Sequence, residues 1–200
     1  MILFVTGQYA GAQYIHPLLK KWSTLNSPKW HLVATGASSK YWDAAEVNYH
    51  SMENPSIDRV TNYINKIKPS LILVSASANI DLEGFFITAS KEQGIITASF
   101  VDIWANYLMR FKHDGELIFP DNILAIDKKC AEEMVSDGIP QNLIRIVGQP
   151  YLESLTKNIP ILGSKTLFTS QPIKKYSNDN LGYNETDFWE ICLQAIKKLG

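Results

Sequence analysis

The sequence predicts an α/β fold, a doubly wound parallel sheet of six to seven strands with helices on both faces. Two observations predict this fold. Short apolar runs rich in β-branched residues recur along the chain, as in strands that are buried on both faces. Most stretches between these runs have apolar residues at the helical period, so that strands and helices alternate.

The composition excludes several classes of protein. Hydrophobic residues make up 46% and charged residues 20% of the 200 residues, as in ordinary globular domains, which excludes disorder and disulfide-dense scaffolds. The 19 basic residues nearly balance the 20 acidic ones, so we expect no nucleic-acid partner. Only Cys130 and Cys192 carry thiols, and two isolated cysteines form no zinc motif. We expect free thiols, no metal, no cofactor, no signal peptide, no membrane span and a cytoplasmic location.

Six apolar runs are predicted as strands, and a seventh is left open. The six are Ile2–Thr6, His31–Thr35, Leu71–Ser75, Ile95–Val101, Asn122–Ile126 and Ile144–Val147, and the seventh is Val47–Met52.

Capping residues mark the helices between the strands. The stripe of Ile57, Val60, Ile64 and Ile67 predicts a helix with Asn54 as its cap and Pro55 as its first residue. Asp81 is predicted to cap a helix that ends at Gly94, and Asp127 to cap one that ends at Gly138. In the first helical segment, Pro17 predicts a kink or a helix start, which would leave a long loop after the first strand.

The chain is divided into a main domain, residues 1–160, and an extra segment, residues 161–200. The extra segment is predicted to hold a strand at Thr166–Ser170 and an amphipathic helix at Asn184–Leu199, with Asn184 and Asp187 as a capping box. It is interpreted either as the start of a second domain or as a helix packed back on the first. The adjacent Phe188 and Trp189 favour packing back, because an uncovered apolar stripe promotes aggregation.

The loop after the first strand is the first part of a predicted binding site. In doubly wound sheets, ligands bind at the carboxyl ends of the strands, beside the strand where the order reverses. This rule selects Gly7, Gln8, Tyr9 and Gly11. The two glycines let backbone amides approach an anion or a sugar closely, and a helix N-terminus follows them.

Two further loops are expected at the same edge. After Leu71–Ser75 come Ser75 and Ser77, small polar residues that lead to Glu83. Glu83 is interpreted either as a ligand of sugar hydroxyls or as an acid that complements its helix dipole. Gln149 ends the sixth strand on this rim, or alternatively forms a tight turn into a helix that starts with proline. His16 beside the first loop is interpreted as a general base or as a structural partner.

The most informative stretch follows the strand Ile95–Val101. It places Asp102, Trp104, Asn106 and Arg110 within nine residues. Aromatic faces with Asp and Asn suit a sugar ring, and Arg suits a phosphate or carboxylate. The alternative is that Trp104, Tyr107 and Phe111 pack a helix onto the sheet, with Asp102 as its cap.

Several of these motifs resemble those of known enzymes. The opening from Thr6-Gly7-Gln8 to Pro17-Leu18-Leu19 resembles the first strand, loop and helix of UDP-N-acetylglucosamine 2-epimerases. The first loop also resembles that of lipid A disaccharide synthase, with Gly7 and Gly11 at its glycines. The junctions Lys68-Pro69-Ser70-Leu71, Gly138-Ile139-Pro140 and Val147-Gly148-Gln149-Pro150 are similar to those of GT-B-type amino-terminal domains. The resemblance covers most of residues 1–155 and implies one Rossmann-like GT-B half.

Departures from these patterns limit what the resemblance implies. Tyr9 and Gly11 stand where the epimerases have Arg and Glu, and Gln8 and Ala12 stand where the lipid A enzyme has Glu and Asp. Neither specific activity is therefore carried over. A second GT-B domain would begin near Leu167-Phe168, and the chain continues there for only one predicted strand and one helix. The resemblance thus implies an acceptor-side half without the donor-binding half.

Three function hypotheses remain open. The first is a sugar-nucleotide protein of GT-B type in polysaccharide or cell-envelope metabolism, with Asp102 or Glu83 as base or hydroxyl ligand. The second is a non-catalytic binding or docking half, completed by a partner chain or a second copy. The third is an NAD-dependent reductase, suggested by the spacing of Gly7 and Gly11. Gln13 at the third glycine position, no acid after the second strand and no Tyr-x-x-x-Lys pair count against the reductase.

Overall fold

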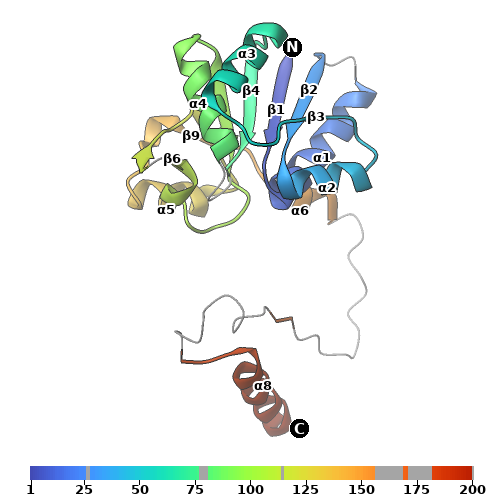
Figure 1. Cartoon of the computed structure of the whole chain (residues 1–200). Helices are drawn as coiled ribbons and strands as arrows, with labels where there is room; N and C mark the ends of the chain where they lie inside the picture. Colours follow the sequence, from blue (N-terminus) through green and yellow to red (C-terminus); the bar gives the residue numbers. More distant parts are fainter. Residues whose placement is uncertain (26–27, 77–80, 114, 156–168, 171–181, 200) are drawn as a thin grey trace. The chain divides into compact units, whose positions relative to one another are not determined.

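The structure is a computed structural model that describes residues 1–25, 28–76, 81–113, 115–155, 169–170 and 182–199 (Figure 1). The chain divides into two compact units, Met1–Ile159 and Pro160–Gly200. Within the described residues, no helix has both the length and the apolar character needed to cross a membrane.

Strands and helices alternate along the first unit, as predicted. In chain order the elements are β1 (Ile2–Thr6), α1 (Tyr9–Thr24), β2 (Trp30–Ala34), α2 (Gly36–Ala44), β3 (His50–Ser51), α3 (Ile57–Ile67), β4 (Leu71–Ser75), α4 (Asp81–Glu92), β5 (Ile96–Phe100), η1 (Leu108–Phe111), β6 (Lys112–His113), β7 (Glu116–Leu117), β8 (Asn122–Ala125), α5 (Lys128–Ser136), η2 (Gln141–Leu143), β9 (Ile144–Ile146) and α6 (Pro150–Leu155).

The main sheet has seven parallel strands in the order β3-β2-β1-β4-β5-β8-β9. The chain builds outward from β1 to β3 and then crosses to β4, so the strand order reverses between β1 and β4. This is the predicted fold class and the predicted position of the reversal. Val47–Met52, left open as a seventh strand, contributes the two-residue edge strand β3.

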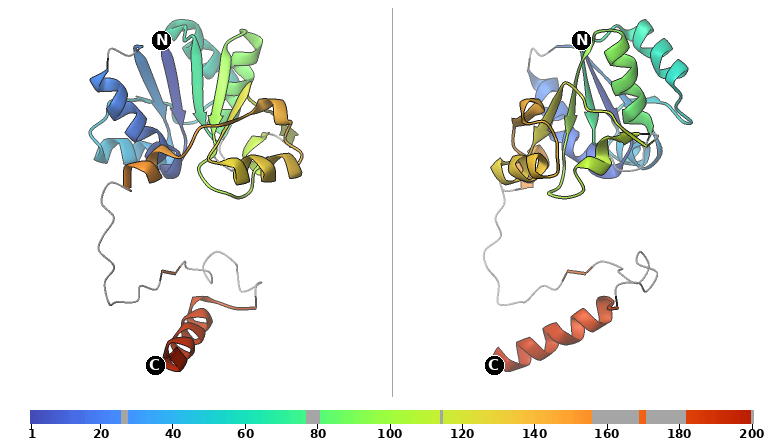
Figure 2. Two further views of the ribbon diagram at one scale, coloured as in Figure 1. Left: turned by 180° about the vertical axis from the view of Figure 1, so that it is seen from behind. Right: turned by 90° about the vertical axis from the view of Figure 1, so that its left-hand side faces the viewer.

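Helices cover both faces of the sheet (Figure 2). Alternate residues of each strand face opposite sides, so Leu3 and Val5 of β1 belong to one core and Phe4 to the other. On the first face, Val60 and Ile64 of α3 and Phe86 of α4 pack against the strands. On the second face, α1 and α2 supply Tyr14, Ile15, Leu19 and Trp42. A third cluster packs α5 through Cys130 and Met134 onto β8.

The long loop predicted after the first strand because of Pro17 is absent, so this prediction was wrong. α1 runs unbroken through Pro17 from Tyr9, so the loop after β1 is short. The helix tolerates the proline because Tyr14, Ile15 and Leu19 are buried against the sheet on either side of it. This packing offsets the lost hydrogen bond, which costs about 3 kcal/mol.

The predicted cap of α3 was also wrong. The helix begins at Ile57, and its cap is Ser56, whose hydroxyl accepts a hydrogen bond from the backbone N–H of Arg59 at 3.4 Å. Asn54 lies outside the helix in a left-handed conformation at φ +50°, and its carbonyl accepts from the Arg59 guanidinium. Ser56 and Asn54 are about equally favourable as N-cap residues. Ser56 is the cap because it has the extended conformation of an N-cap, whereas Asn54 is left-handed. α4 begins at Asp81 itself, the residue predicted as its cap, and Asp127 caps α5 as predicted.

The described part of the second unit contains α8 (Glu185–Leu199). The predicted capping box is confirmed, since Asn184 accepts from the amide of Thr186 at 2.8 Å and donates its own amide to Asp187 at 2.8 Å. Phe188 and Ile191 are exposed. Most of the strand predicted at Thr166–Ser170 lies outside the described residues, and Thr169 and Ser170 form no strand.

Candidate functional site

The candidate site lies at the carboxyl ends of β1, β4 and β5, at the lower end of the sheet in Figure 1. These three strands are neighbours, so the residues that follow them meet at one edge. Gly7 follows β1, Ala76 follows β4, and Asp102 comes two residues after β5. The strand reversal therefore brings together the loops that the sequence singled out.

A buried carboxylate joins the first two of these loops. Glu83, in the first turns of α4, is only 4% exposed. Its Oε1 accepts a hydrogen bond from the Gly7 N–H at 3.0 Å and another from the Ser75 hydroxyl at 2.7 Å. Glu83 therefore connects the residue that follows β1 with the last residue of β4.

Gly11 lets α1 approach β4 closely. A Cβ atom at this position would lie 2.4 Å from Ser75 Cβ and 2.6 Å from Ser75 Oγ. Only glycine allows this contact, and Ser75 is the same residue that donates to Glu83. Gly11 thus has a packing role, since it sets how closely α1 lies on β4.

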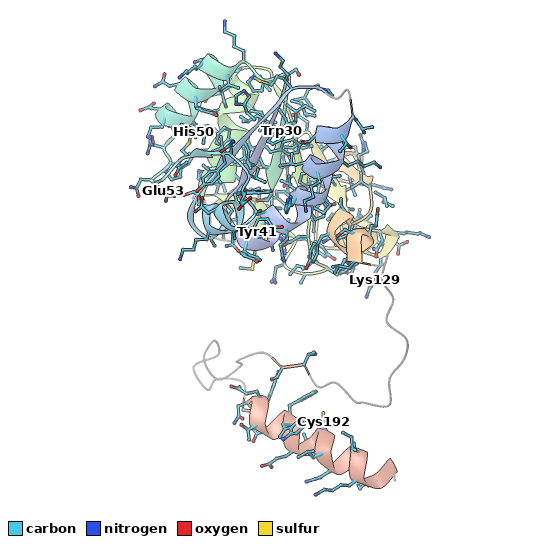
Figure 3. The ribbon with its side chains drawn as sticks, turned by 90° about the vertical axis from the view of Figure 1, so that its right-hand side faces the viewer. Trp30, Tyr41, His50, Glu53, Lys129 and Cys192 are labelled. Carbon is cyan, nitrogen blue, oxygen red and sulfur yellow. The ribbon has the colours of Figure 1, made fainter. Side chains whose placement is uncertain are left out.

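The predicted Gly7–Gly11 loop is mostly the start of a helix. Gln8 is the N-cap of α1, and Tyr9 begins it. Both side chains are exposed, and the Tyr9 ring contacts the Tyr41 ring of α2 at 4.9 Å, in an edge-on geometry. Tyr41, labelled in Figure 3, also bonds His16 Nδ1 through its hydroxyl at 2.7 Å. Of the two interpretations of His16, the structure favours the structural partner, and burial lowers the pKa of its imidazole.

The loop after β5 is organised around a largely buried ion pair. Arg110 Nη1 lies 2.6 Å from Asp102 Oδ1, and the two side chains are 7% and 17% exposed. The same guanidinium donates to the carbonyl oxygens of Ala76 at 2.5 Å and Ala105 at 3.2 Å. Arg110 therefore ties the end of β4 to the whole of this loop.

The packing alternative for this loop was right for two of its aromatic residues. Tyr107 and Phe111 are buried, next to and in the short turn η1, whereas Trp104 is 40% exposed. Asp102 caps no helix, because it is engaged by Arg110. The Trp104 indole N–H donates to Asp127 Oδ2 at 2.9 Å, and Asn106 adopts a left-handed φ of +56°. A rigid loop thus presents an indole and an amide to solvent.

Tyr107 anchors this loop to α5, and the contact gives a testable pKa. Its hydroxyl donates to Glu133 Oε2 at 2.6 Å, and this hydrogen bond, with a smaller contribution from Lys129, lowers the pKa of the Glu133 carboxyl. In the Tyr107→Phe variant we expect that pKa to rise toward its usual value. A carboxyl-detected NMR titration measures it. An unchanged pKa in Tyr107→Phe, or a larger rise in Lys129→Met, would contradict the assignment.

Gln149 satisfies both interpretations of its role. Its Oε1 accepts from the Tyr151 N–H at 2.8 Å and so caps α6, the helix that starts at Pro150. Its Nε2 donates to the Asp102 carbonyl at 3.3 Å, which joins the end of β9 to the site. The last predicted site residue, Ser77, lies outside the described residues.

The sequence did not reveal a small cavity next to this edge of the sheet, which both polar and apolar side chains line. Ser75, Glu83, Ser99, Arg110 and His113 are among its lining residues. Ser99 is 1% exposed, and its hydroxyl has no hydrogen-bond partner among the described residues. The sequence signal that could have indicated this cavity was Ser99, a polar residue inside the apolar run of β5. Within the described residues, no group of three His, Cys, Asp or Glu side chains is placed to hold a metal.

No family model and no curated protein matches this sequence. Solved structures do match the fold. Staphylococcus aureus MnaA, solved with UDP, is similar at a TM-score of 0.60 and 16% identity, over 88% of this chain and 50% of that one. The UDP-GlcNAc 2-epimerase of Neisseria meningitidis, bound to UDP-GlcNAc, gives 0.58 and 16%, over 78% and 50%. Anabaena HepE, solved with UDP and glucose, gives 0.52 and 13%, over 74% and 44%.

These similarities establish the fold of the chain. It has a Rossmann-like, GT-B-type fold that resembles one half of a UDP-GlcNAc 2-epimerase, as the motifs implied. The chain spans about half the length of the solved structures that it matches.

Proposed function

We propose that this chain is a sugar-nucleotide-related protein of GT-B type, acting as the acceptor-side half in polysaccharide or cell-envelope metabolism. Similar folds were solved with UDP, UDP-GlcNAc, or UDP and glucose, which supports a ligand of this class. The free thiols of Cys130 and Cys192 are consistent with a reducing cytoplasm, the location that we propose.

One observation carries this proposal: the loop after β5, one strand away from the reversal, exposes Trp104 and Asn106 near the ion-paired Asp102. An indole face packs against the apolar face of a sugar ring, and amide and carboxylate groups bind its hydroxyls. The loop is held by Arg110 and by the bonds of Trp104 to Asp127 and of Tyr107 to Glu133. A preformed site loses little conformational entropy when a ligand binds.

The proposed roles of the site residues follow from their positions. Asp102 would bind a sugar hydroxyl or act as its base, and Arg110 would hold Asp102 in place. Glu83 would have an indirect role, because its hydrogen bond to the Gly7 N–H holds the residues that follow β1 in place. The other residues proposed to line the site are Gly7, Gln8, Tyr9, Gly11, Ser75, Ser77, Asn106 and Gln149.

Replacing Trp104 tests this function. The intact chain is titrated calorimetrically with UDP-GlcNAc, UDP-glucose and the free sugars. We expect Trp104→Ala to weaken the binding of whichever ligand the chain takes by about tenfold, since one aromatic stacking contact contributes on the order of 1 kcal/mol or more.

The control is Trp189→Ala, because Trp189 lies on α8 and is also 40% exposed. It should leave the affinity unchanged. If the wild-type chain bound none of these ligands, or if both variants lost affinity equally, the proposal would be wrong.

A second candidate function is a non-catalytic binding half that a partner chain or a second copy completes. The engagement of both predicted catalytic acids favours it: Asp102 pairs with Arg110, and Glu83 is buried under the Gly7 amide. Turnover assays of the intact chain with a UDP-sugar separate the two. Robust turnover by the chain alone would exclude the non-catalytic alternative.

A further inference from the structure

The helix α8 of the second unit is apolar along one side. Its large exposed apolar residues are Phe188, Trp189, Ile191 and Ile196. At the helical period they surround Cys192, and the other side of the helix carries Asp187, Glu190, Gln194 and Lys197. A helix of 15 residues is only marginally stable in water by itself and depends on the packing of its apolar side. We therefore looked for the surface that this side fits.

Cys192, labelled in Figure 3, lies at the centre of the apolar side. It is the middle residue of the 15 that form α8, and its thiol is half-buried. Phe188 and Ile196 lie one helical turn before and after it on the same side of the helix. A twofold axis through Cys192 would therefore place Phe188 of one copy level with Ile196 of a second copy.

The charges of α8 are complementary under the same twofold axis. The amino-terminal half carries acidic residues, and the last turn carries Lys197 and Lys198. In an antiparallel pair, Asp187 of one copy comes level with Lys197 of the other, because both lie five residues from Cys192. Each acidic end then lies beside a basic end, whereas a parallel pair would bring like charges together.

We propose that α8 is a self-association surface, through which two copies of this chain pair in an antiparallel manner about Cys192. The second copy is the partner because an interface with twofold symmetry must be complementary to itself, and α8 is so in both its charges and its apolar residues. This surface is independent of the sugar ligand proposed above. Two helices of this length bury less than a standard interface, so we expect a weak dimer that dissociates on the order of tens of micromolar.

Sedimentation equilibrium of the intact, reduced chain tests the self-association. We expect the average mass to rise from one chain toward two chains as the concentration increases. Cys192→Asp would place two carboxylates at the axis of the pair and should weaken the dimer by about tenfold or more. The matched control is Gln194→Asp, which adds the same charge to the polar side of α8 and should leave the dimer unchanged.

Thiol cross-linking tests the antiparallel orientation. Cys130 is buried, so a bis-maleimide with a two-carbon spacer should join wild-type chains through Cys192. In the variant Cys192→Ser/Ile196→Cys, the two thiols of an antiparallel pair would be about 12 Å apart along the helix axis. In a parallel pair they would be level. We therefore expect this variant to cross-link far more slowly than the wild type, at a concentration at which sedimentation shows both to be dimeric.

Two results would overturn the self-association through α8. They are a chain that sediments as a monomer at about ten times the expected dissociation constant, and a dimer that Cys192→Asp leaves intact. Equal cross-linking rates at positions 192 and 196 would overturn the antiparallel pairing. None of these results bears on the proposed sugar binding, which Trp104→Ala tests separately.

Discussion

Replacing Gly11 by alanine is expected to lower the free energy of unfolding by about 2 to 3 kcal/mol, the usual cost of overpacking a core. The added methyl group would lie 2.4 Å from Ser75 Cβ, an atom fixed by the backbone of β4. At an exposed helical position the same change would stabilise the protein by up to about 1 kcal/mol, so the expected sign is diagnostic. Urea denaturation measures it.

A double-mutant cycle tests the cause of this loss. Ser75→Gly removes the atoms that the new methyl group would meet, although it also removes a donor to Glu83. The double variant should therefore lose less stability than the sum of the two single variants. Simple additivity would show that Gly11 and Ser75 are not in contact.

Replacing Arg110 by methionine is expected to lower the free energy of unfolding by about 2 to 4 kcal/mol, somewhat less than for a fully buried pair, because one partner of a largely buried ion pair is removed. The Asp102 carboxylate and the carbonyl oxygens of Ala76 and Ala105 would each lose a donor. Since this guanidinium ties β4 to the loop that carries Trp104, we also expect the binding of the proposed sugar ligand to be lost. Denaturation and calorimetry measure the two effects.

Arg145→Met is the matched control. The Arg145 guanidinium also donates to two backbone carbonyl oxygens, those of Asn142 and Ile144, but it lies on the exposed edge of the sheet. We expect a change within about 0.5 kcal/mol, as for ordinary surface substitutions. Equal losses in the two variants would contradict the central role of Arg110.

Local patterns were sufficient where a side chain bonds the backbone of a residue close to it in the sequence. The capping box of Asn184 and Asp187 and the cap at Asp127 are formed as predicted, because such caps connect residues three positions apart. β1 and β4 begin and end where the apolar runs predicted. Local signals failed at the start of α3, where Asn54 and Ser56 were equally suitable caps. They also failed at Pro17, where the packing of α1 on the sheet outweighed the tendency of proline to interrupt a helix.

For the candidate site, the sequence determined the edge of the sheet and most of the residue types that meet there. The alternation of strands and helices predicts a doubly wound parallel sheet, and the reversal of strand order beside the first strand predicts which loops converge. Only the tertiary structure decided the partners of Glu83 and Arg110. The contact of Glu83 with Gly7 joins residues 76 positions apart, and that of Arg110 with Ala76 spans 34. Such contacts depend on how α4 and the loop after β5 pack, and no local pattern of residues encodes that packing.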